Sequence, residues 1–190
     1  MRLTITLETL SSRENCSDLY EHLTEALGPD WRYDQEIDLL DLLDLCGADD
    51  VLWVLHMARE PERDSVGRLI AADCAELALP VYKKHAYLPG SDNSVENAIR
   101  VARQYVAGEV PFVDLLAAKH SASDASHAAY MHSEAAGAAA TAAEHAVGYP
   151  NGAAARAAAS AERAIVSAFG EAARAAALEQ ITGIVRRHLS

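Results

Sequence analysis

The chain has 190 residues, of which 51% are hydrophobic and only 6% aromatic. This length fits one domain of ordinary size, whose core must consist mainly of aliphatic side chains and alanine. No run approaches the roughly 20 apolar residues that span a bilayer, and the N-terminus lacks the basic start and apolar stretch of a signal peptide. Cys16, Cys46 and Cys74 have no metal-site spacing and indicate reduced thiols. We expect a soluble, cytoplasmic protein that does not bind membranes.

The net charge of −12 is concentrated in residues 1–80, which hold 18 acidic and 6 basic side chains, whereas the rest of the chain is neutral. The densest part has seven carboxylates with no Lys or Arg between them: Asp34, Glu36, Asp38, Asp41, Asp44, Asp49 and Asp50. Such a surface attracts basic proteins and repels phosphates. We expect these seven residues to bind a protein partner and the chain not to bind nucleic acid directly. The alternative is that they only keep the protein soluble.

The N-terminal elements are predicted from helix breakers and from the spacing of apolar residues. Residues 3–7 fit either a strand or a loop, and Ser11 or Ser12 then caps a helix that ends at Gly28. The next helix begins near Asp34. Within it, three carboxylates recur at every third position and form an acidic ridge beside an apolar stripe: Asp38, Asp41 and Asp44.

Further helices follow in the middle of the chain. Residues 48–58 are apolar nearly all round and are predicted to be buried. Pro61 suits the first turn of the next helix, in which Pro80 is a candidate kink. Residues 88–94 have the composition of a turn, and the helix after them is closed by Gly108.

The C-terminal half is dominated by alanine between residues 117 and 177. Alanine has the highest helix propensity but buries little area, so helices faced with alanine must pack closely to gain stability. We predict two long antiparallel helices at residues 112–147 and 153–188, separated by a turn at 148–152.

No segment has the alternating β-branched pattern of a sheet. The predicted fold is all-α, an orthogonal or antiparallel bundle of six to seven helices in which the two long alanine-rich helices pack closely. Residues 1–60 are expected to form an acidic helical segment and residues 61–190 an alanine-rich helical domain, together one continuous fold.

Three runs carry a family resemblance: AADCAELALPVY (71–82), DNSVENAIRVARQYVAGE (92–109) and AGAAATAAEHAVG (136–148). Their order and spacing resemble the alanine-rich helical immunity proteins of bacteria, whose domain is called immunity-five-like. The preceding segment, DLLDLLDLCGADDVLWVLHMA (38–58), is similar to one that precedes this domain in many members. The similarity covers about residues 36 to 178. Members usually have Arg-Pro where this chain has Ser94-Val95, and their acidic patch is less marked. The resemblance implies a protein that binds and neutralises a partner, without catalysis or cofactor.

One face of the predicted helix 112–147 gathers imidazoles and carboxylates. Its members follow at helical spacing: His120, Asp124, His127, Met131 and Glu134. Such a face can hold a transition metal. It contains neither an HExxH nor a Glu-x-x-His pair, so a solvated surface is the favoured interpretation. The same predicted helix also carries His132 and His145.

Asp73 and Glu76 lie in an otherwise apolar helix. Buried carboxylates are tolerated when they are paired, so we predict an ion pair between Asp73 and Arg103 or Arg100 and give acid–base catalysis less weight. The chain has no nucleophile elbow, P-loop or dinucleotide fingerprint. We therefore predict neither an enzymatic activity nor a cofactor.

The sequence favours a stoichiometric inhibitor or immunity-type protein, which neutralises a toxin, nuclease or nucleic-acid-binding effector through its acidic surface. A phage-type anti-defence protein, anti-CRISPR or anti-restriction, in which carboxylate rows imitate DNA phosphates, is one alternative. A metal-dependent enzyme that uses the His/Asp face around His120 is another. A second copy of the chain, in a homodimer, is a further candidate partner.

Overall fold

The computed structural model describes residues 2–11, 17–86, 93–150 and 152–190, and only the backbone of residues 17 and 18. Most of these residues are helical, which confirms the all-α class, and the described ranges contain ten α-helices rather than six or seven. None of these helices combines the length and the apolar character that crossing a membrane requires. Three features of the sequence analysis lie outside the described residues: Cys16, Ser12 as a helix N-cap, and residues 88–92 of the predicted turn.

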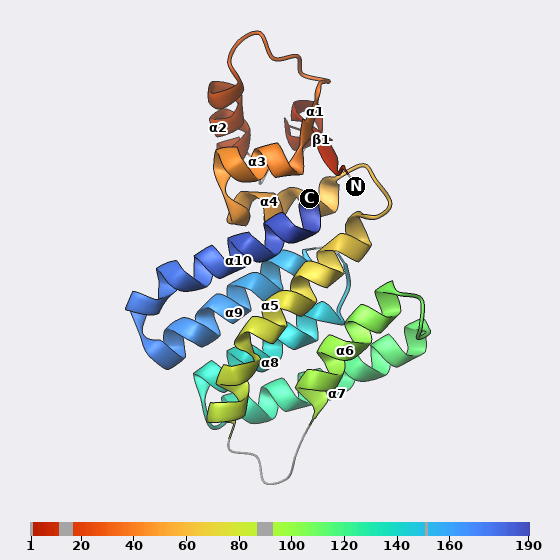
Figure 1. Cartoon of the computed structure of the whole chain (residues 1–190), viewed down its shortest axis with the longest axis vertical. Coiled ribbons are helices and arrows are strands. Elements are labelled where there is room, and N and C mark those ends of the chain that lie inside the picture. Colours follow the sequence, from red (N-terminus) through yellow and green to blue (C-terminus); the bar gives the residue numbers. More distant parts are fainter. Residues whose placement is uncertain (1, 12–16, 87–92, 151) are drawn as a thin grey trace.

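A small N-terminal part, the cap, lies at one end of a larger helical bundle (Figure 1). The cap comprises the described residues up to residue 57. Its elements are, in chain order, β1 (Thr4–Thr6), α1 (Leu7–Ser11), α2 (Ser17–Leu27), β2 (Glu36–Asp38), α3 (Leu39–Cys46), α4 (Ala48–Val54) and the 3-10 helix η2 (Leu55–Met57).

The cap contains a two-stranded sheet, so the prediction of a chain without a sheet is wrong. Strands β1 and β2 pair antiparallel, with Ile5 opposite Ile37. Both isoleucines are buried, which gives this short ladder an apolar inner face. The helix expected from Asp34 begins only at Leu39, because Asp38 is extended and its carboxylate accepts a 2.8 Å hydrogen bond from the N–H of Leu40.

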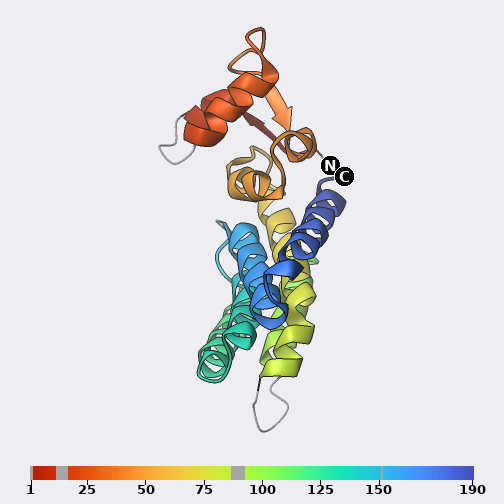
Figure 2. The same cartoon turned by 90° about the vertical axis from the view of Figure 1, so that its left-hand side faces the viewer.

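The bundle comprises the described residues from 63 onward. Its elements are α5 (Arg63–His85), α6 (Ser94–Val106), α7 (Phe112–Tyr130), α8 (Glu134–Ala146), α9 (Ala153–Phe169), the 3-10 helix η3 (Glu171–Ala173) and α10 (Arg174–Leu189). Helix α5 continues through Pro80. Seen from the side, the cap covers one end of the elongated bundle, and α10 reaches towards it (Figure 2). The predicted domain boundary at residue 60 stays a prediction; it coincides with the loop between η2 and α5.

The helix predicted at residues 112–147 is in fact two helices, α7 and α8, which pack against each other. The chain leaves α7 at Met131, and Ser133 caps α8 by accepting a 3.3 Å hydrogen bond from the N–H of Ala136. The helix predicted at residues 153–188 is also interrupted. Gly170, at φ +84°, adopts a left-handed conformation that favours glycine, and the chain continues through η3 into α10.

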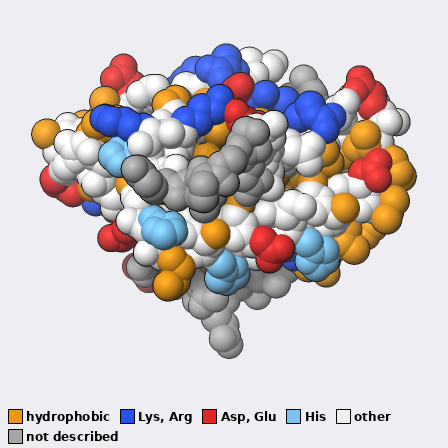
Figure 3. Space-filling model, turned by 90° about the horizontal axis from the view of Figure 1, so that it is seen from below, with side chains coloured by type: hydrophobic (Ala, Val, Ile, Leu, Met, Phe, Trp, Pro, Cys, Tyr) orange, Lys and Arg blue, Asp and Glu red, His pale blue; other side chains and the backbone are white. Residues whose placement is uncertain are grey.

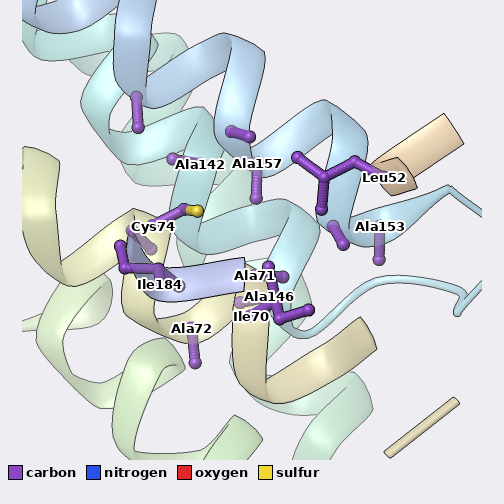
Figure 4. Close-up of a cluster of buried hydrophobic side chains, with 14 of the residues drawn as sticks. Leu52, Ile70, Ala71, Ala72, Cys74, Ala142, Ala146, Ala153, Ala157 and Ile184 are labelled. Atoms are coloured by element: carbon purple, nitrogen blue, oxygen red, sulfur yellow. The ribbon is translucent and has the colours of Figure 1, made fainter. Parts of the chain in front are cut away.

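The core of the bundle is built largely from alanine. Helix α8 packs against α5, α7 and α9, and its buried side chains are alanines throughout. Figure 4 shows Ala142 and Ala146 of α8 beside residues of α5 and α9, with Ile184 of α10 and Leu52 of the cap at the edges of the same cluster. Close packing of α5, α7 and α9 around α8 therefore replaces the two long helices that the composition predicted.

Candidate partner-binding site

The seven carboxylates predicted to bind a partner do not form one uncompensated surface. Four of them are paired with arginines from elsewhere in the chain: Asp34 with Arg32 at 2.7 Å, Glu36 with Arg59 at 3.7 Å, Asp38 with Arg2 at 2.8 Å and Asp44 with Arg186 at 2.5 Å. The stretch itself contains no Lys or Arg, so the partners of these four carboxylates come from outside it: Arg2, Arg32, Arg59 and Arg186. Hydrogen bonds from Arg32 and Arg186 lower the pKa values of the Asp34 and Asp44 carboxyls.

The acidic ridge of Asp38, Asp41 and Asp44 is correspondingly weakened. Asp38 is half-buried because it caps α3, and Asp44 is tied to α10 through Arg186. Asp41 is exposed and makes no ion pair with any described residue. Of the ridge, only Asp41 thus offers its full charge to a partner.

Asp49 is the other exposed carboxylate of the seven without an ion pair in the described chain. It lies at the start of α4 and lines a groove of about 260 Å³ between α4, α9 and α10, hereafter the Trp53 groove. The lining residues are Asp49, Leu52, Trp53, Ala155, Ala158, Ala159, Glu162, Leu178 and Ile181. Its walls are apolar apart from the two carboxylates.

Trp53 gives the groove an accessible aromatic surface. Residues 48–58 were predicted to be buried, and Val51, Leu52, Val54 and Leu55 confirm this, but Trp53 is 46% exposed. Its ring meets the His56 ring edge to face, with centroids 6.3 Å apart. The exposure of Trp53 could not be predicted from this apolar segment, because it depends on where α9 and α10 pack.

Only one of the two carboxylates in the groove is free. Glu162 on α9 is paired with Arg174 of α10, which also binds Glu171. Asp49 has no such partner among the described residues. The groove therefore combines an exposed indole, alanine walls and one uncompensated negative charge.

Asp50, the last of the seven, lies apart from this arrangement. It is half-buried, and its ligand atoms lie close to those of His22 on α2 and Cys46 on α3. Burial raises the pKa of the Asp50 carboxyl, which the nearby His22 partly offsets. Asp50 is thus part of a mixed cluster rather than of the acidic surface.

The histidine face proposed for metal binding is not continuous. His120, Asp124 and His127 are exposed on α7, but Met131 lies at the end of that helix and Glu134 begins α8. The Nδ1 of His127 forms a 2.8 Å hydrogen bond with the carbonyl oxygen of Ser123. Among the described residues, the one group of three side chains that could hold a metal ion is His22, Cys46 and Asp50 in the cap, not this face of α7.

The predicted pairing of Asp73 is confirmed for Arg103, which donates to its carboxylate at 2.6 Å. His188 of α10 adds a second contact at 2.9 Å. Burial alone would raise the pKa of Asp73, but the hydrogen bonds from His188 and Arg103 lower it to about 2. Arg100 instead binds Asn97 and Gln104. The network joins α5, α6 and α10 and therefore has a structural explanation.

No family model, curated protein or solved structure matches this chain.

Proposed function

We propose that this protein is a stoichiometric, non-catalytic inhibitor of the immunity type, which binds a basic protein partner at the Trp53 groove. The observation that carries the proposal is the exposed Trp53 side chain in an apolar groove whose free charge is Asp49. Tryptophan in a pocket is a frequent centre of binding energy at protein interfaces.

The groove suits an arginine or lysine side chain of the partner. The aliphatic part of such a side chain fits against the alanine walls formed by Ala155 and Ala158. Its cationic end can then contact the Trp53 ring face and the Asp49 carboxylate, which combines a cation–π contact with a charge-assisted hydrogen bond. The remaining negative charge of the cap steers basic partners towards this end of the molecule.

A toxin or nuclease-type effector is a better partner class than a DNA-binding cleft that would accept a phosphate mimic. Imitation of DNA requires rows of uncompensated charges, about one per phosphate. Here arginines neutralise four of the seven carboxylates, including Asp38 and Asp44 of the ridge. The distribution of charge favours recognition of individual basic side chains.

The proposal is tested by affinity capture from cells that produce candidate toxins, followed by calorimetry with the captured protein. Trp53→Ala should weaken binding about 30-fold, which is the effect expected for an interface hot spot. Asp49→Asn should weaken it about 10-fold at low salt and less at high salt, because screening reduces the charge contribution. Asp41→Asn measures how much the acidic ridge contributes to the affinity for the partner.

The matched control is Asp114→Asn, which removes one exposed, unpaired carboxylate from α7 in the bundle. It should leave the affinity unchanged. Sedimentation of the protein alone shows whether the captured partner is a second copy. If Trp53→Ala and Asp49→Asn bind the partner as tightly as the parent does, the groove is not the binding site.

A further inference from the structure

We propose that His22, Cys46 and Asp50 bind a zinc ion that fastens α2 to α3 and α4. Their ligand atoms all lie within 4.8 Å of one another, although the residues come from three different helices. The site is separate from the Trp53 groove and does not depend on the proposed function.

Local structure explains why two of the ligands meet. Cys46 is the last residue of α3, and Asp50 lies in the first turn of α4. Gly47 between these helices has φ +90°, a conformation that favours glycine and allows the sharp change of direction. His22 reaches the same place from α2, which packs against α3.

The three side chains match zinc in chemistry and approximate geometry. A thiolate, an imidazole and a carboxylate are the three common zinc ligands, whereas magnesium and calcium select oxygen alone. In a tetrahedral zinc site the ligand atoms are about 3.3–3.6 Å apart. The ligand atoms must therefore approach one another by up to about 1.5 Å. His22 is exposed and so has the freedom to move inward.

The electrostatics of the cluster also favour a cation. Cys46 and Asp50 are both half-buried, and neither makes a hydrogen bond or ion pair with another described side chain. A bound zinc ion supplies the positive charge that both groups lack, and the thiol loses its proton on binding.

A zinc ion here would stabilise the cap. Helix α2 is attached through buried leucines such as Leu19 and Leu23, and the metal would add a second, polar attachment to the turn between α3 and α4. Three protein ligands leave the fourth zinc position for water.

The test is a titration of Co²⁺ into the full chain, after a chelator has removed bound metal and the cysteines have been reduced. Co²⁺ should bind with 1:1 stoichiometry and a Kd below about 10 μM, with a thiolate charge-transfer band and the visible bands of tetrahedral cobalt. Zn²⁺ should displace it. Cys46→Ser should abolish the charge-transfer band, and His22→Ala and Asp50→Asn should weaken binding at least about 10-fold. The matched controls, His127→Ala and Asp114→Asn, should bind cobalt like the parent.

Thermal unfolding with and without zinc is a second test, which remains valid if a variant of a ligand residue is less stable than the parent. Zinc at about 100 times its Kd should raise the Tm of the parent by about 5 °C or more and leave that of Cys46→Ser unchanged. Absence of a charge-transfer band, its persistence in Cys46→Ser, or binding only at millimolar metal would overturn the proposal. Because Trp53→Ala removes the indole of the groove but no metal ligand, loss of partner binding with intact cobalt binding in that variant concerns the groove alone.

Discussion

In the cap, the fully buried side chains are large, for example Leu23, Leu39 and Leu42, whereas in α8 of the bundle they are alanines such as Ala139 and Ala142. A buried leucine removes much more apolar area from water than an alanine does. The cap can therefore be stabilised by a few large contacts, but the bundle depends on many short ones between closely packed backbones. Equal burial therefore does not mean equal sensitivity to mutation. The cap should lose most stability when buried volume is removed, and the bundle when buried volume is added.

The two regions also differ in charge. The cap holds most of the excess acidic residues, and one of its carboxylates, Asp44, is neutralised from the bundle by Arg186. At the opposite end of the bundle, Lys and Arg side chains gather along one edge, and Asp and Glu are scattered (Figure 3). The excess of negative charge therefore lies in the cap, and a basic partner should approach from that side.

The largest expected effect comes from a reciprocal exchange of volume. Leu42→Ala in the cap should lower the free energy of unfolding by about 2–5 kcal/mol, because it leaves a cavity at a fully buried position. Ala142→Leu in α8 should lower it by about 1–3 kcal/mol, because three neighbouring helices enclose the site. Urea unfolding measures both. A neutral Ala142→Leu variant would show that the bundle is loosely packed and that the comparison fails.

The second largest effect is a loss of folding stability at acidic pH, which arises from His145 in the bundle. Burial, with the nearby charges of Arg156 and Lys119, lowers the pKa of His145 to about 4, compared with about 6.5 in an unfolded chain. Between these values the unfolded state binds a proton that the folded state does not. Stability should therefore fall as the pH drops from about 6.5 to 4, by about 2–3 kcal/mol in all.

Urea unfolding at pH 7 and pH 4.5 tests this dependence. His145→Asn should lose less stability between the two pH values than the parent, while His127→Ala, which changes an exposed histidine of α7, should behave like the parent. Equal losses in the parent and His145→Asn would assign the acid sensitivity to carboxylates instead.

The sequence predicts some structural features of this protein better than others. Alanine content and leucine spacing predicted helix, and the apolar flanks of Asp73 predicted its ion pair with Arg103. The helix breaks were missed: Ser133 and Gly170 are residues that commonly end or begin a helix, but the alanine-rich sequence on either side favours helix.

The candidate sites were less accessible to sequence analysis than the fold. The pairing of Asp44 with Arg186 joins residues far apart in the chain, so it did not show in a local count of charges. His22 and Cys46 follow no metal-binding spacing and meet only because α2 packs against α3. Tertiary contacts of this kind leave no periodic signal in the sequence.

The smallest effect compares two helical glycines. At Gly137 in α8, an added methyl group would overlap the Tyr130 ring, whereas at Gly183 in α10 it would meet nothing within 4 Å. Alanine is favoured over glycine in a helix by about 1 kcal/mol, so Gly183→Ala should stabilise the protein by about 0.5–1 kcal/mol. Gly137→Ala should lower stability by about 1 kcal/mol, because displacement of the ring outweighs that gain. In a Tyr130→Ala background the overlap is absent, and Gly137→Ala should then become stabilising. If it stays destabilising there, the backbone around α8 rather than the Tyr130 ring limits the space, and the bundle is even more sensitive to added volume than the comparison with the cap implies.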